Sequence, residues 1–219
     1  MITRIELHHV LPDVFSDATD RQPVCSSQVW LRDVTFHKGR RYMIEAESGT
    51  GKSSLCSFIY GNRRDYSGAI LFDGQDTRSF SPSRWSAIRK TSIALLPQEM
   101  RLFPQLTVLE NIDIKNRLTH HASPQEIMNM LERVELAHKA DTPAGLLSIG
   151  QQQRVAIVRA LCQPMDFILL DEPVSHLDSR NNQIVASLIA DEASRQGAAI
   201  IATSVGNKIN IPDPEIIRL

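Results

Sequence analysis

Residues 48–54 read SGTGKSS and follow an apolar segment that ends near Ala46. Small residues let a backbone wrap closely around a polyphosphate, and free amide groups at the start of a helix supply positive potential. Lys52 adds a full positive charge, and the hydroxyl of Ser53 is a typical magnesium ligand. The stretch therefore predicts a phosphate-binding loop between a strand and a helix. Its candidate nucleotide-binding residues are Ser48, Gly49, Thr50, Gly51, Lys52, Ser53 and Ser54.

One position departs from the usual pattern of such loops. The pattern begins with a glycine five residues before Gly51, and here that residue is Ala46. Taken alone, the stretch also fits a glycine- and serine-rich turn with an incidental lysine. Four further motifs decide between these interpretations.

Residues 167–172 read FILLDE, an apolar strand that ends in two acids. Carboxylates at the carboxyl end of a parallel strand lie where ligands collect in open α/β sheets. Asp171 is the candidate to hold magnesium through water, and Glu172 is the candidate to orient and polarise an attacking water. A strand followed by an acidic turn is the alternative for this pair in isolation.

Residues 147–154 read LSIGQQQR. Ser148 is placed to cap a helix that runs to about Leu161, so its hydroxyl and the first free amides form an anion site. The stretch resembles the LSGGQ signature that defines the ATP-binding cassette (ABC) family, and its spacing to the acidic strand also matches that family. The resemblance implies that Ser148, Gly150 and Gln151 close over the γ-phosphate of ATP bound to a second cassette. Ile149 stands where the family has its first signature glycine.

Two smaller motifs have the order and spacing of the same family. Residues 95–98 read LLPQ and resemble the Q-loop, which implies that Gln98 senses magnesium and the γ-phosphate. Residues 175–178 read SHLD and resemble the D-loop, which implies that Asp178 communicates between two opposed nucleotide sites.

The largest departure lies near the end of the chain. The family places a switch histidine after the last core strand, and the corresponding residue here is Ser204. A serine hydroxyl is shorter than an imidazole and cannot become cationic. We therefore expect Ala46, Ile149 and Ser204 to leave nucleotide binding intact and to slow hydrolysis.

The residue that stacks on adenine is less sharply defined. Relatives of this kind usually provide an aromatic residue shortly after the first strand, and Phe15 is the nearest candidate. The alternative is that Phe15 is a loop residue packed on the core.

Composition limits the partners. The 24 Lys and Arg residues nearly balance the 25 Asp and Glu residues, so the net charge of −1 gives no field for holding nucleic acid. No apolar run approaches the roughly 20 residues that cross a bilayer. Three widely separated cysteines favour a reducing compartment. We expect a protein on the cytoplasmic face of a membrane, with transmembrane permease subunits supplied by other chains.

The pattern predicts an α/β fold: a P-loop NTPase core with a mixed sheet, an antiparallel N-terminal β lobe and an inserted helical subdomain. We expect strands over residues 4–10, 29–36 and 41–46, a hairpin over 69–74, and core strands over 167–170 and 198–202. All of the early strands are expected to be antiparallel. A single domain covers 1–219, with the core and β lobe in 1–98 and 149–219 and the helical signature subdomain in 99–148.

Three functions fit these motifs. The first is a subunit that dimerises on ATP, hydrolyses it with Mg²⁺ and drives membrane-spanning partners. Residues 102–111 resemble the helical lobe of importers and of lipoprotein- or macrolide-type exporters alike. The second is an ATP-sensing regulatory cassette with little turnover, favoured by the three departures. The third, a soluble cassette of DNA repair or translation, fits less well, because such relatives usually carry a long coiled-coil insertion or two cassettes in one chain and this sequence has neither.

Overall fold

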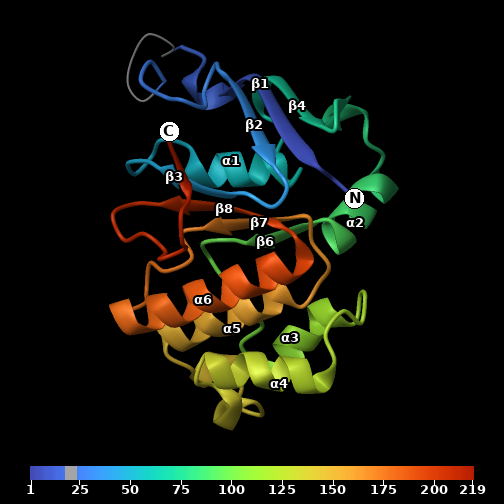
Figure 1. Ribbon diagram of the computed structural model, residues 1–219, viewed down its shortest axis with the longest axis vertical. Helices are drawn as coiled ribbons and strands as arrows, with labels where there is room; N and C mark the ends of the chain where they lie inside the picture. The colour runs from blue at the N-terminus through green and yellow to red at the C-terminus, as the bar shows by residue number, and fades with distance from the viewer. Residues whose placement is uncertain (18–23) are drawn as a thin grey trace.

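The computed structural model describes residues 1–17 and 24–219, whose strands form two separate sheets (Figure 1). The strands are β1 (Arg4–Pro12), β2 (Asp33–His37), β3 (Arg41–Glu45), β4 (Tyr66–Phe72), β5 (Gln75–Asp76), β6 (Ile93–Leu96), β7 (Phe167–Asp171), β8 (Ala199–Ser204) and β9 (Glu215–Arg218). The α-helices are α1 (Lys52–Ile59), α2 (Pro82–Thr91), α3 (Val108–Asn116), α4 (Pro124–Arg133), α5 (Ile149–Leu161) and α6 (Ser179–Gln196). Short 3₁₀ helices cover Asp13–Phe15, Thr77–Ser79, Ala137–Lys139 and Ala144–Leu146.

The larger sheet has the strand order β6-β7-β8-β3-β9, and all of its pairs are parallel. Helix α1 lies between this sheet and the antiparallel sheet, while α5 and α6 cover the opposite face (Figure 1). Parallel strands covered on both faces are expected to be apolar throughout. Strand β7 fits this expectation, since all five of its residues are buried.

Alternation along the strands divides the interior into two cores. Phe167 and Leu169 of β7 point into the core that contains α1, whereas Ile168 and Leu170 point into the core that contains α5 and α6. Successive side chains of a strand face opposite sides of its sheet. The larger sheet therefore holds α1 on one face and α5 and α6 on the other.

The smaller sheet is antiparallel, with the order β2-β1-β4-β5. Strands β4 and β5 are joined at Asp73 and Gly74, which both have positive φ. The hairpin predicted from Asp-Gly after an apolar run is confirmed.

The expectation that all early strands are antiparallel is wrong for β3. This strand pairs in parallel with β8 and β9 and lies inside the larger sheet. Parallel and antiparallel strands are therefore separated into two sheets instead of one mixed sheet. Strand β9, which no pattern indicated, forms the edge beside β3.

The strand expected over 29–36 begins later, at Asp33. Val29 and Trp30 are fully buried, but both of their amides donate to the hydroxyl of Ser27, at 3.0 and 2.8 Å. Leu31 then has a φ of 57°, a left-handed conformation that ends any extended run.

Helices α3 and α4 form the lower lobe in Figure 1, within residues 99–148. Ser123 and Glu126 have the three-residue spacing of a capping box, and α4 begins with one: the Glu126 amide donates to the Ser123 hydroxyl at 3.2 Å and the Ser123 amide donates to the Glu126 carboxylate at 2.7 Å. Hydrogen bonding to Ser123 lowers the pKa of Glu126. Within the described residues, no helix combines the length and the apolar composition that a membrane span requires.

Two glycines with positive φ, one in β4 and one at the end of α6, can be compared to test the close approach of β4 to β1. At Gly68 (φ +81°), an added Cβ would lie 2.4 Å from the carbonyl oxygen of His9, whereas at Gly197 (φ +61°) it would meet nothing within 4 Å. We expect Gly68→Ala to lower the free energy of unfolding by about 3 kcal/mol and Gly197→Ala by about 1 kcal/mol, because only the first adds overlap to the left-handed backbone cost. Urea denaturation of both variants measures the difference, and equal losses would contradict the close approach of β4 to the His9 backbone.

Candidate functional site

The register of the larger sheet brings the ends of three strands together. Asp171 at the end of β7 is paired with Thr203 of β8, and Ser204 is paired with Glu45 at the end of β3. The loop of residues 46–51 follows β3 directly and leads into α1. Ligands of open α/β sheets bind outside the carboxyl ends of the strands, so this edge is the candidate site.

The loop is held from behind by two aromatic side chains. The Trp30 indole Nε1 donates to the Thr50 carbonyl at 3.0 Å, and the Thr50 hydroxyl donates to the Glu47 carbonyl at 2.9 Å. A Cβ at Gly51 (φ +100°) would lie 2.9 Å from the Trp30 ring and 3.4 Å from the Phe15 ring. Only glycine fits the backbone at this position.

Gly49 presents the opposite situation on the front of the loop. Its φ is +83°, and an added Cβ would meet no atom within 4 Å. The backbone beside it is exposed and open to an approaching ligand. The loop therefore offers a bare backbone cradle of the kind that binds phosphate.

Lys52, the first residue of α1, carries the positive charge of the cradle. Its ammonium donates to the Glu47 carbonyl at 2.9 Å and lies 3.6 Å from the Glu172 carboxylate, with only 5% of its side chain exposed. A buried charge needs partners. Both partners belong to the candidate site, so the ammonium is held at the base of the loop.

Thr203 joins the two acids at the end of β7. Its hydroxyl donates to Asp171 Oδ1 at 2.9 Å and accepts from the Glu172 amide at 3.2 Å. Glu172 itself has a φ of 50°, which turns its side chain away from the strand direction. Nearby, burial and the charge of Asp171 raise the pKa of Cys56 in α1 well above its usual value, so this thiol stays neutral.

Gln98 and Gln153 hold Glu172 from two directions. The Gln98 amide nitrogen lies 3.4 Å from Glu172 Oε2. The buried Gln153 donates to the Glu172 carbonyl at 3.3 Å and accepts from the His176 amide at 3.1 Å. The Glu172 carboxylate is thus placed between a cation and an amide donor.

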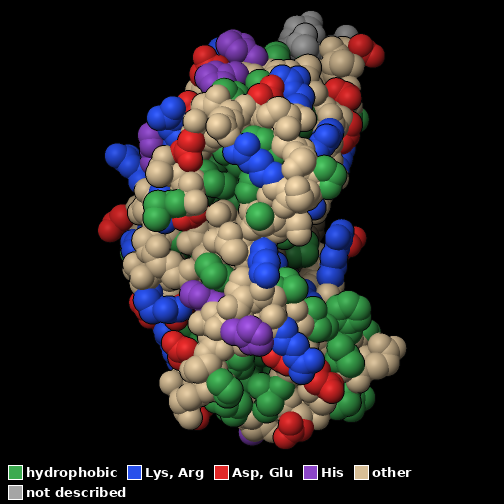
Figure 2. Space-filling model, turned by 90° about the vertical axis from the view of Figure 1, so that its right-hand side faces the viewer, with side chains coloured by type: hydrophobic (Ala, Val, Ile, Leu, Met, Phe, Trp, Pro, Cys, Tyr) green, Lys and Arg blue, Asp and Glu red, His purple; other side chains and the backbone are tan. Residues whose placement is uncertain are grey.

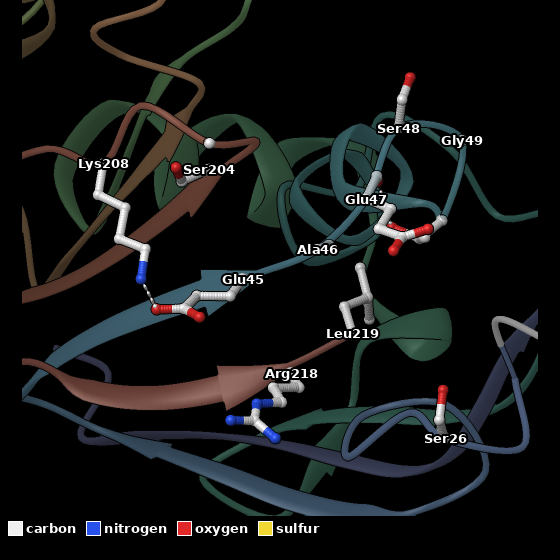
Figure 3. A pocket seen from close by; sticks show the side chains of 12 residues that line it. Ser26, Glu45, Ala46, Glu47, Ser48, Gly49, Ser204, Lys208, Arg218 and Leu219 are labelled. Atoms are coloured by element: carbon white, nitrogen blue, oxygen red, sulfur yellow. Dashed lines mark hydrogen bonds and ion pairs between the residues drawn. The ribbon is translucent and has the colours of Figure 1, made fainter.

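The cavity beside the loop has a volume of about 810 Å³ (Figure 3). Its lining comes from the loop, the segment after β8 and the C-terminal strand: Ser26, Glu45, Ala46, Glu47, Ser48, Gly49, Thr50, Ser204, Gly206, Lys208, Arg218 and Leu219. Ser204 is buried, and its hydroxyl donates to the Asn207 carbonyl at 2.9 Å. The side chains drawn in Figure 3 place Ser204 and Lys208 on one side and Ser48 and Gly49 on the other.

The predicted signature residues form a separate group at the start of α5. The Ser148 hydroxyl accepts from the Gln151 amide at 3.3 Å, and the Gln151 side chain accepts from the Ser148 amide at 2.9 Å. Ile149 is 53% exposed, and a Cβ at Gly150 would lie 3.0 Å from the His176 carbonyl. Among the residues that the structure describes, none of this group lines the cavity.

Asp178 is likewise outside the cavity lining and caps α6. It accepts from the Asn181 amide at 2.8 Å, and hydrogen bonds to Asn181 lower its pKa. Two exposed groups, the start of α5 and Asp178, are thus available to a second molecule.

Phe15 lies against the loop and also packs on the core that contains α1. The structure therefore supports the contact with the core that the sequence offered as an alternative. Its role as an adenine platform remains a prediction.

The sequence is similar to proteins of known family. Residues 32–175 match the family model described as ABC transporter. The chain belongs to the ABC transporter family. It is an ABC ATPase, the nucleotide-binding subunit of a transport system.

Several ABC relatives are similar over most of the chain. The lipoprotein-releasing system ATP-binding protein LolD of Shewanella denitrificans is 31% identical, covering 92% of this chain and 86% of its own length. LolD of Shewanella frigidimarina is 32% identical over 81% and 75% of the two chains. The phosphonates import ATP-binding protein PhnC of Rhizobium etli is 35% identical over 77% and 63%.

Solved ABC structures have the same fold. A dimeric ATP-binding cassette in a post-hydrolysis state, bound to ADP and Pi, matches with a TM-score of 0.77 and 25% identity over 98% of this chain and 94% of that one. A bacterial Atm1-family ABC exporter with ATP bound matches with a TM-score of 0.73 and 25% identity, over 93% of this chain and 35% of the exporter chain. The predicted α/β P-loop fold is confirmed.

Some residues of this ABC site carried no signal in the sequence. Thr203 and Trp30 act through neighbours that are distant along the chain, so no local spacing indicates them. Gln153 lies within the LSIGQQQR stretch, but its contact with Glu172 joins it to another segment and is not visible in that motif.

The link between Thr203 and the two acids can be tested with an isosteric change. We expect Thr203→Val to lower the free energy of unfolding by about 1–3 kcal/mol, because it leaves the buried Asp171 carboxylate and the Glu172 amide without their shared partner. ATPase activity should fall in parallel. Thr203→Ser keeps the hydroxyl and serves as the control in thermal unfolding and phosphate-release assays; a valine variant as stable and active as wild type would contradict this role.

Proposed function

We propose that the chain hydrolyses Mg-ATP between two cassettes and transmits the resulting change to membrane-spanning partners. The observation that carries this proposal is the placement of Lys52, Gln98 and Glu172 within contact distance at the carboxyl edge of the sheet. This edge combines a phosphate cradle, a cation and a carboxylate, which are the parts that phosphoryl transfer requires.

The residues present account for the proton and the negative charge that move in the reaction. A water oxygen forms a bond to the γ-phosphorus, the bond from that phosphorus to the bridging oxygen breaks, and its electron pair stays on ADP. Glu172 orients the water and accepts one of its protons, which then passes to solvent. Lys52 and the loop amides stabilise the charge on the transferring phosphoryl group.

The oxygen donors at this edge also fit a magnesium ion. Ser53 is exposed at the start of α1, Asp171 lies at the end of β7, and Gln98 is exposed beside Glu172. Magnesium prefers oxygen ligands and nucleotide phosphates. We propose that these three residues would hold it, and that the bound ion would supply positive charge for the phosphates of ATP.

A second cassette would complete the site. The amides at the start of α5, capped by the exposed Ser148 and followed by Gly150 and Gln151, form an anion site. Asp178, which follows the acidic strand and caps α6, is exposed as well. The matching solved cassette is a dimer, which supports this arrangement for the present chain.

The helical lobe is the proposed contact with permease subunits. Charged side chains of both signs are interspersed on the face shown in Figure 2, and hydrophobic side chains gather on its lower part. The large apolar side chains exposed within 99–148 are Phe103, Ile114, Leu118 and Leu146. Exposed apolar groups of this kind are typical of interaction surfaces. We therefore propose a peripheral position on the cytoplasmic face of a membrane.

We also propose that the three departures from the family pattern slow hydrolysis. Ala46 starts the loop, Ile149 is exposed at the start of α5, and Ser204 stands in place of a switch histidine. The Ser204 hydroxyl has one proton, and that proton is donated to Asn207. The position therefore offers no donor to a γ-phosphate, which also favours the alternative of an ATP-sensing cassette.

Phosphate release separates the hydrolysing cassette from the sensing one. We expect purified wild-type protein to release phosphate from Mg-ATP, and Glu172→Gln to reduce kcat by about 10²–10⁴-fold because the general base is lost. With millimolar ATP, the variant should shift to dimer mass in light scattering, since bound ATP is retained. Wild-type release no faster than that of the variant would favour the sensing cassette, and failure to bind Mg-ATP would overturn both.

The proposed slowing can be tested by restoring an imidazole. Ser204 lines a cavity with room for a larger side chain, so we expect Ser204→His to raise steady-state ATPase activity by about tenfold through one charge-assisted hydrogen bond. Circular dichroism and thermal unfolding control for loss of the bond to Asn207. An unchanged or lower rate in a folded variant would count against the idea that Ser204 limits turnover.

A further inference from the structure

The turn after β8 holds the backbone of Lys208 firmly. The Ser204 hydroxyl donates to the Asn207 carbonyl at 2.9 Å, and the Asn207 side chain donates to the Val174 carbonyl at 3.0 Å. From α6, the Asn182 side chain donates to the Lys208 carbonyl itself at 2.8 Å. The start of the Lys208 side chain is thus positioned by residues from three segments, although the side chain is 51% exposed.

The Lys208 ammonium is paired with a carboxylate that it can leave for another anion. It forms an ion pair with Glu45, the last residue of β3 before the phosphate loop (Figure 3). Exposed ion pairs of this kind contribute little stability. A flexible four-carbon stem lets a lysine move its charge while its backbone stays fixed.

Lys208 also lines the same cavity as the phosphate loop. Ser48 and Gly49 form one side of this cavity, and Ser204 and Lys208 contribute from the segment after β8. The two segments are directly joined, because the Ala46 amide donates to the Ser204 carbonyl at 3.3 Å. Lys52 is not among the residues that line this cavity, and it contacts the loop through the Glu47 carbonyl at 2.9 Å. A cation on the cavity side would add to it.

The chemistry of the site leaves a place for such a cation. Transferring phosphoryl groups are stabilised by positive charges aimed at their oxygens. Ser204 cannot serve, because it has no charge and its proton is donated within the turn.

We infer that Lys208 is a second phosphate-binding cation of this site, which leaves Glu45 to bind the terminal phosphate of ATP. The inference rests on the proposed function and adds a binding residue to it. Glu45 and the γ-phosphate compete for one ammonium, so Glu45 sets the strength of the contact. Since ADP lacks the γ-phosphate, Lys208 favours ATP over ADP.

Binding measurements can test this assignment. In a Glu172→Gln background, which keeps ATP intact, titration calorimetry gives Kd values for Mg-ATP and Mg-ADP. We expect Lys208→Gln to weaken ATP binding by about tenfold, the size of one hydrogen bond between charged groups, and to change ADP binding by less than about twofold. Lys208→Arg should restore most of the ATP affinity.

Glu45→Gln provides the complementary test. Releasing Lys208 from its partner should strengthen ATP binding several-fold and leave ADP binding unchanged. That gain should disappear in the double variant Glu45→Gln/Lys208→Gln, because Glu45 acts through Lys208. A purely structural role of the ion pair predicts losses for both nucleotides in both single variants.

Two other substitutions control for the loss of one positive charge. Lys90→Gln removes an exposed lysine of α2 and should change neither Kd. Arg218→Gln removes the other cation that lines the cavity. An ATP loss as large as that of Lys208→Gln would indicate a general field and overturn the assignment, as would equal losses of ATP and ADP affinity in Lys208→Gln. If the parent fails to bind ATP, the proposed function fails instead.

Discussion

The parallel register of β3, β7 and β8 is the constraint on which the site depends. Because Asp171 is paired with Thr203 and Glu45 with Ser204, three strand ends meet at one edge of the sheet. The phosphate loop and the acids are thereby joined without any direct link in sequence. The two cores fix this register, since a shift by one residue would exchange the side chains that face α1 with those that face α5 and α6.

Hydrogen bonds to neutral groups then convert the sheet edge into an ordered site. Thr203 holds both acids of the strand end, and Gln153 holds the carbonyl of Glu172 together with the segment that leads to Asp178. Trp30 supports the loop from behind. Preorganised groups of this kind lose little freedom when a charged ligand binds, so the supporting residues matter as much as the charged ones.

Two of the departures from the family pattern, Ala46 and Ser204, are neighbours in the structure, whereas Ile149 lies in the separate group at the start of α5. Ala46 and Ser204 are linked through their backbones, and the Ser204 side chain stabilises the turn that carries Lys208. A serine in place of the family's histidine and the positioned Lys208 therefore belong to one local arrangement. The role proposed for Lys208 would change the source of positive charge at the site, and with it the balance between ATP and ADP.

The sequence by itself determined the fold class, the phosphate loop, the acidic strand and the caps at Ser123 and Ser148, because each depends on neighbouring residues and on local backbone chemistry. It also led to the family. Only the tertiary structure decided that β3 is parallel, that β9 exists, that Thr203 and Trp30 contact the acids and the loop, and that Lys208 lines the cavity beside the loop. Strand pairing and side-chain contacts join residues that are far apart along the chain, and their partners are chosen by packing of the whole domain, which no local pattern records.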